Sequence, residues 1–93
     1  MGILVGVVLA YDEASGRARV GVRSLLRRGG RIQIVGGRTD VELKLKAPRF
    51  CAPAMDLAGA WRYEMDILTP SVEVGDMVFH IVSDQPAFAP AVA

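Results

Sequence analysis

The chain has 93 residues, of which 52% are hydrophobic and 23% are charged, and its formal net charge is +1. This length allows one domain with one compact core, and the apolar fraction and low net charge exclude intrinsic disorder. A single cysteine excludes a disulfide framework and fits a reducing compartment. No run reaches the roughly 18 apolar residues that a membrane helix needs, so we expect a soluble cytoplasmic domain without a membrane contact.

Strand patterns follow one another along the chain, whereas helical periodicity is nearly absent. Residues 1–10 are apolar but lack the basic start of a signal peptide, and we interpret them as a strand. A turn at residues 11–16 follows. The further expected strands are residues 17–23, 31–35, 41–46, 61–68 and 77–82. Most of them alternate apolar and polar residues, which predicts one face on the core and the other in water.

The same alternation predicts which side chains point inward. In the last strand, Met77, Phe79 and Ile81 are expected on the core side, which places His80 on the outer face. Other positions expected inside are Met55, Trp61, Tyr63 and Met65. These side chains would fill an interior too narrow for a ligand, so we expect no cofactor site there.

About six short strands with regular turns indicate a small antiparallel barrel or sandwich over residues 1–83, followed by a Pro/Ala-rich tail at residues 84–93. We prefer the closed barrel because closure hides the backbone edges that would otherwise aggregate. Residues 47–60 contain Pro48 and Pro53, so we expect an edge strand or a crossing loop there.

Five short segments carry a characteristic order of glycines and apolar residues. They are V-G-V-V (residues 5–8), G-R-A-R-V (16–20), L-R-R-G-G-R-I-Q-I (26–34), G-G-R-T-D (36–40) and V-E-V-G-D-M-V-F (72–79). In this order they resemble the second domain of elongation factor Tu and its relatives. The resemblance implies a six-stranded Greek-key barrel that serves as an accessory or binding domain.

Residues 8–20 are equally similar to the barrel that closes collagenase-like peptidases and the related tRNA-hydroxylation proteins. Two departures stand out: Gly30 replaces the usual Asp of a Gly-Asp pair, and residues 48–59 lack the usual spacing. The chain also has no G-x-x-x-x-G-K-[ST] motif, so neither nucleotide binding nor hydrolysis carries over from the elongation factors.

Residues suited to catalysis are few. The one histidine, His80, and the one thiol, Cys51, have nothing in the sequence that brings them together as a nucleophile and base. Glu64 and Asp66 share the outer face of one expected strand, where a solvated pair is the ordinary state. One Cys and one His do not supply a metal-ligand set, so we expect no metal, no cofactor and no enzyme activity.

The charges divide unevenly along the chain. Residues 1–46 carry a net charge of +5 and residues 47–93 carry −4. The candidate RNA-contacting residues are Arg17, Arg19, Arg23, Arg27, Arg28, Arg31, Lys44 and Lys46. If the strands at 17–23 and 41–46 are neighbours, these side chains form one cationic patch, whose guanidinium groups would grip phosphates with paired hydrogen bonds.

The sequence therefore predicts a binding module that contacts RNA or a ribonucleoprotein through an arginine-rich face. One alternative is a protein-interaction or assembly domain, including self-association of the basic and acidic halves. Another is an accessory subunit of a separately encoded enzyme.

Overall fold

The computed structural model describes residues 2–54 and 59–82, and this part of the chain consists of strands, turns and loops without a helix. The strands are β1 (Gly2–Asp12), β2 (Arg17–Val22), β3 (Arg31–Val35), β4 (Asp40–Lys44), β5 (Arg49–Pro53), β6 (Tyr63–Leu68) and β7 (Met77–Ile81). Every strand pair is antiparallel. The expected all-β antiparallel class is confirmed.

The seven strands form one open sheet in the order β4-β3-β7-β1-β2-β6-β5. Because β4 and β5 lie at the two ends and do not pair with each other, the expected closed six-stranded barrel is wrong in both closure and strand number. The two edges are protected without closure. Both end strands have only five residues, and β5 ends on Pro53 and shifts register at Cys51, features that discourage further strand pairing.

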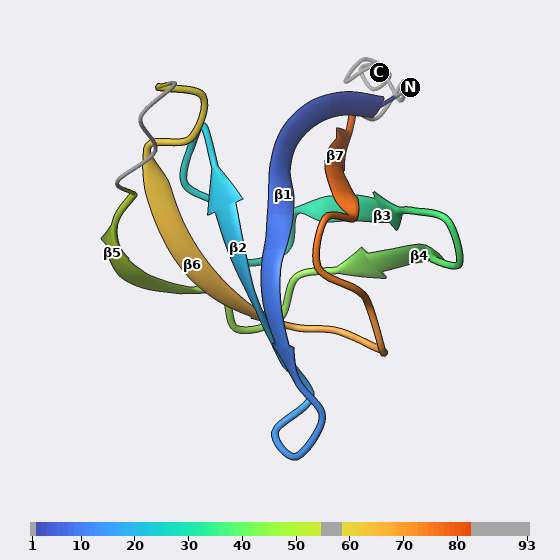
Figure 1. Cartoon of the computed structure of the whole chain (residues 1–93). Coiled ribbons are helices and arrows are strands. Elements are labelled where there is room, and N and C mark those ends of the chain that lie inside the picture. The colour runs from blue at the N-terminus through green and yellow to red at the C-terminus, as the bar shows by residue number, and fades with distance from the viewer. Residues whose placement is uncertain (1, 55–58, 83–93) are drawn as a thin grey trace.

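The sheet folds over along its central strand, β1, so that β2, β6 and β5 form one wing and β7, β3 and β4 form the other (Figure 1). Apolar side chains from both wings meet between them. The buried core consists of Val8, Ala18, Val20, Val22, Ile32, Ile34, Leu45, Met65, Ile67, Val72 and Val78. Two of these, Leu45 and Val72, lie on loops and extend the core beyond the strands.

The predicted alternation holds in β2 and over most of β6. Val20 and Met65 are buried, as expected. Trp61, however, precedes β6 and lies on the outer face, where its Cγ is 3.4 Å from the position that a Cβ on Gly21 would occupy. The inward prediction for Trp61 is wrong because β6 begins only at Tyr63, so the two-residue period does not extend back to Trp61.

The predicted sidedness of β7 is also wrong. Val78 is fully buried, whereas Met77 is 42% exposed. Val78 lies opposite Ile34 and His80 lies opposite Ile32, so His80 points to the core side of the sheet, at its exposed end. Shifting the inward–outward alternation by one residue turns every side chain of a strand to the other face. Because β7 is apolar at nearly every position, its sequence does not show which face points inward.

Residues 47–60 contain the edge strand β5, which confirms one of the two expected structures for this segment. Phe50 on β5 is 55% exposed and contacts Tyr63 edge-on, with ring centroids 6.3 Å apart. An edge strand with one neighbour leaves such a ring half uncovered.

Short-range hydrogen bonds and glycines shape the turns. Between β1 and β2, Ser15 Oγ donates to Asp12 Oδ2 at 2.7 Å, and Gly16 takes a φ of 69°. Before β7, the buried Asp76 accepts the Glu73 N–H at 2.8 Å. A Cβ on Gly36 would overlap the Asp76 carboxylate, so the turn after β3 and the turn before β7 pack tightly together.

The described residues contain no helix that is long and apolar enough to span a membrane. The predictions for Met55 and for the Pro/Ala-rich tail at residues 84–93 fall outside the described residues.

Candidate nucleic-acid interface

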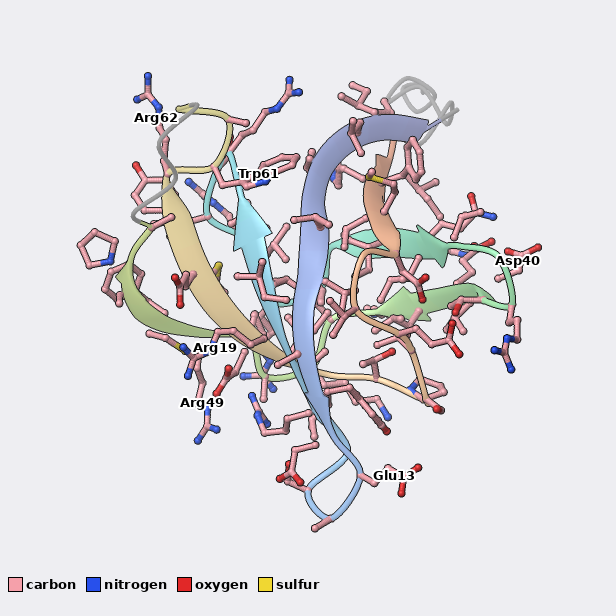
Figure 2. All side chains as sticks on the ribbon, in the orientation of Figure 1. Glu13, Arg19, Asp40, Arg49, Trp61 and Arg62 are labelled. Carbon is pink, nitrogen blue, oxygen red and sulfur yellow. The ribbon has the colours of Figure 1, made fainter. Side chains whose placement is uncertain are left out.

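The outer face of β2, β6 and β5 carries a ladder of alternating charges. Arg19 donates from Nε to Asp66 Oδ1 at 2.8 Å and from Nη1 to Glu64 Oε1 at 3.1 Å. Arg49 lies on the other side of Asp66, with Nη2 3.5 Å from Oδ2. Asp66 faces both arginines in the strand register, which is why all three side chains meet on one face. Figure 2 labels the two arginines, Arg19 and Arg49. Glu64 and Asp66 share the outer face as expected, but both side chains are partly buried and paired with Arg19 and are not freely solvated.

These contacts shift the pKa values of the paired side chains. Burial by itself would raise the pKa of Asp66, but hydrogen bonds from Arg19 and Cys51 and the nearby arginine charges outweigh it, so the pKa lies below its ordinary value. The same Asp66 contact raises the pKa of Arg19. Burial, followed by the Asp66 carboxylate, raises the pKa of the Cys51 thiol, which makes it a poorer nucleophile at neutral pH.

Arg17 is held by the backbone. Its Nη2 donates to Ala47 O at 2.7 Å and lies 3.5 Å from Asp66 O, whereas its Nε is buried without a hydrogen-bond partner among the described residues. Arg17, Arg19 and Arg49 line a surface depression of about 460 Å³ together with Asp66 and the β1–β2 turn. The carboxylates offset the positive charge of this depression.

Two further predicted residues are engaged within the chain. The Arg23 guanidinium lies over the Trp61 ring, 5.6 Å from its centroid, in a cation–π contact. Arg31 pairs with Glu42 across β3 and β4. Each of these side chains would have to leave an existing partner, or share it, in order to bind a phosphate.

Arg28, Lys44 and Lys46 form what we call the cationic cluster. The N–H of Gly29 donates to Leu45 O at 2.8 Å and the N–H of Leu45 donates to Gly30 O at 2.7 Å, which ties the loop before β3 to the end of β4. This tie brings the three cations around a surface depression of about 430 Å³. All three are exposed, and none of them forms an ion pair with any residue in the described ranges 2–54 and 59–82.

The remaining predicted residue, Arg27, lines a separate, more apolar depression of about 290 Å³ with Leu25 and His80. Arg27 is exposed and also has no ion pair among the described residues. It lies one residue from Arg28 but on the other side of Leu45, which lines both depressions.

The eight predicted residues therefore do not form one continuous patch. β3, β7 and β1 lie between β2 and β4 in the sheet, so the strands at 17–23 and 41–46 are not neighbours. The structure brings together Arg28, Lys44 and Lys46. Arg19 is separated from them in sheet order, whereas the Arg17 guanidinium bonds to Ala47 O, next to Lys46. Sequence reasoning missed Arg49, because its link to Asp66 depends on the β5–β6 register.

The two residues with nucleophile and base chemistry stay apart. Cys51 is on β5 and His80 is on β7, and β6, β2 and β1 lie between these strands. Among the described residues, no group of three or more His, Cys, Asp and Glu side chains has an arrangement that could hold a metal ion.

Comparison of the chain with protein-family models, with curated proteins and with solved structures finds no match.

Proposed function

We propose that this chain is a non-enzymatic binding module that contacts the RNA backbone through the cationic cluster, with Arg27 next to it. The observation that supports this most directly is the contrast between two kinds of cation. Arg19 and Arg31 already have carboxylate partners, whereas Arg28, Lys44 and Lys46 share one depression and form no ion pair with a described residue.

A cation without a partner retains its full attraction for a phosphate, and each phosphate that it neutralises releases counterions. The cluster combines a planar guanidinium, which suits two hydrogen bonds to one phosphate, with two compact ammonium groups. None of the residues lining its depression is aromatic, so stacking on unpaired bases is not expected there. The cluster is suited to holding a phosphate backbone and not to reading a sequence.

The resemblance of residues 2–82 to a translation-factor domain favours RNA as the polyanion and a cytoplasmic setting. The proposal is narrower than the prediction from sequence. It assigns the phosphate contacts to the loop before β3 and the end of β4, and it leaves the arginines of β2 a structural role.

The test is a fluorescence-anisotropy titration with a short single-stranded RNA at several salt concentrations. Three phosphate contacts predict a slope of about −2 in log K against log salt, at about −0.7 per contact. The double variant Arg28→Gln/Lys44→Gln should weaken binding and reduce the slope by about 1.4.

A matched control removes the same charge elsewhere. Arg38, in the β3–β4 turn, and Arg62, before β6, are both exposed (Figure 2 labels Arg62). The variant Arg38→Gln/Arg62→Gln should retain the wild-type slope. Absence of binding at low salt, a salt-independent affinity, or equal losses in the two double variants would each contradict the proposal.

A further inference from the structure

The loop that joins β2 to β3, residues 23–30, crosses from one wing of the sheet to the other, because β1 and β7 lie between these strands (Figure 1). The N–H of Arg23 donates to Val5 O on β1 at 2.9 Å, and the N–H of Leu26 donates to Met65 Sδ in the core at 3.2 Å. The backbone hydrogen bonds to the end of β4, described above, hold the other end of the loop. The loop is therefore fixed to both wings.

This loop, together with β1, β7 and the residue after β4, lines the depression of about 290 Å³ that includes Arg27. We call it the apolar depression. Most of its lining is aliphatic and comes from Val5, Leu25, Leu26 and Leu45. Leu25 is 50% exposed, so a large apolar side chain is left in contact with water at this place.

Val5 lies in the apolar depression at an irregularity of β1. The register of β1 with β7 shifts between Leu4 and Gly6, so Val5 is an extra residue that lies opposite no residue of β7. An extra residue of this kind changes the direction in which a side chain points, and such bulges are common next to binding sites.

Three polar side chains complete the lining of the apolar depression, namely Ser24, Arg27 and His80. All three are exposed, and within residues 2–54 and 59–82 none of them forms an ion pair or a side-chain hydrogen bond. A hydroxyl, a guanidinium and an imidazole can each donate a hydrogen bond. None of the described residues that line the depression is acidic, so no carboxylate there offsets the charge of Arg27.

We propose that the apolar depression binds a small aliphatic carboxylate, with its hydrocarbon chain against Val5 and the leucines and its carboxylate at Arg27. An apolar pocket with a few polar groups is the usual form of a small-molecule site, in which the polar groups fix the orientation of the ligand. The planar guanidinium suits two hydrogen bonds to one carboxylate, and the lining offers no acidic partner to an ammonium group.

The size of the apolar depression limits the length of the ligand. A water molecule takes up about 30 Å³ of liquid volume, so the depression has room for about ten groups of that size. A straight chain of about eight carbons that ends in a carboxylate has this size. Longer chains would extend into solvent.

This inference goes beyond the RNA proposal and does not rest on it. The carboxylate site uses Arg27, whereas the cationic cluster consists of Arg28, Lys44 and Lys46. The test below contains no RNA, so its failure leaves the RNA proposal standing, and failure of the RNA titration leaves the carboxylate site standing.

The test is an NMR titration of the ¹⁵N-labelled protein with sodium octanoate. The amide shifts of Leu25, Arg27 and His80 should change and reach saturation. A ligand of about ten non-hydrogen atoms with ordinary ligand efficiency predicts a dissociation constant on the order of 1 mM. Octylammonium has the wrong charge and acetate lacks the chain, so neither should produce saturable changes at these residues.

Two variants test the two parts of the site. Arg27→Gln removes the charged hydrogen-bond donor and should weaken octanoate binding about tenfold. Leu25→Ser removes apolar contact and should weaken it about fivefold. Arg62→Gln is the matched control, because Arg62 is also exposed and without an ion pair among the described residues, but does not line the apolar depression. It should bind octanoate like the wild type.

Both altered side chains in the apolar depression are exposed, so the variants should keep the fold, and the dispersion of their amide spectra verifies this. Saturable changes at Leu25, Arg27 and His80 that Arg27→Gln weakens support the proposal. The absence of saturable changes up to about 20 mM octanoate, roughly twenty times the expected dissociation constant, overturns it. So does equal binding of octylammonium, or an Arg27→Gln affinity equal to that of the wild type.

Discussion

Asp66 shows at the level of single residues why a count of positive charges overstates the binding surface. It is held by Arg19 and approached by Arg49, and it accepts these contacts on the outer face where the sequence predicts a solvated carboxylate. Its side chain is only 21% exposed. Arg19 was therefore a reasonable candidate for phosphate binding from its position in β2, but its partner lies 47 residues away in the chain and cannot be identified from charge alone.

The ladder predicts an acid-sensitive contribution to stability. Because the pKa of Asp66 is lowered in the folded state, its stabilisation is fully present above the ordinary aspartate pKa and is lost as pH falls through the lowered value. At pH 7, Asp66→Asn should destabilise the fold by about 1 kcal/mol, or a fall in Tm of roughly 4–8 °C.

Thermal unfolding followed by circular dichroism at pH 7 and near pH 2 measures this effect. The Tm difference between wild type and Asp66→Asn should shrink as the pH is lowered, because protonation of the wild-type carboxyl removes its ion pairs. Glu13→Gln, in the exposed turn labelled in Figure 2, is the control and should match the wild type at both pH values. An equal Tm difference at the two pH values would show that the ion pairs are not its cause.

Gly36 packs against the turn before β7, where no room is left for a side chain. A Cβ there would overlap the buried Asp76 carboxylate, which accepts the Glu73 N–H, whereas a Cβ on Gly37 meets no atom within 4 Å. Gly36→Ala should destabilise the fold by about 1–3 kcal/mol. Gly37→Ala should be neutral or slightly stabilising, because alanine reduces the freedom of the unfolded chain. Urea unfolding of the two variants tests this, and similar midpoints would contradict the tight packing of the two turns.

At the level of elements, alternation and turn chemistry were sufficient to locate most of the strands. The interpretation of residues 17–23 was correct in both position and sidedness, because alanine and valine alternate there with arginine. β7 was placed correctly but with the wrong face inward. Its residues are apolar on both sides, since Val78 fills the core while Met77 and Phe79 project from the opposite side of the sheet. When both faces of a strand are apolar, the alternation of residues cannot show which face points to the core.

Whether the sheet closes into a barrel could not be predicted from local sequence patterns either. Residues 47–60 were recognised as irregular from Pro48 and Pro53, but β5 and its pairing with β6 depend on contacts across the chain. The order of the strands decides which cations are neighbours. β1, β7 and β3 separate β2 from β4, whereas two backbone hydrogen bonds join Leu45 to the Gly29–Gly30 turn and assemble the cationic cluster.

For the molecule as a whole, the open sheet presents three distinct surfaces. The inner faces of the two wings enclose the core, the centre of the outer face is apolar, and the cationic cluster lies at the end of β4.

The most direct test of the RNA proposal is residue-resolved NMR of the ¹⁵N-labelled protein, titrated with a short single-stranded RNA at low salt. We predict that the largest amide shift changes occur at residues 28–30 and 44–46, with small changes along β2. Changes centred on Arg17, Arg19 and Arg23, or the absence of any RNA-dependent change, would contradict the assignment of phosphate binding to the cationic cluster.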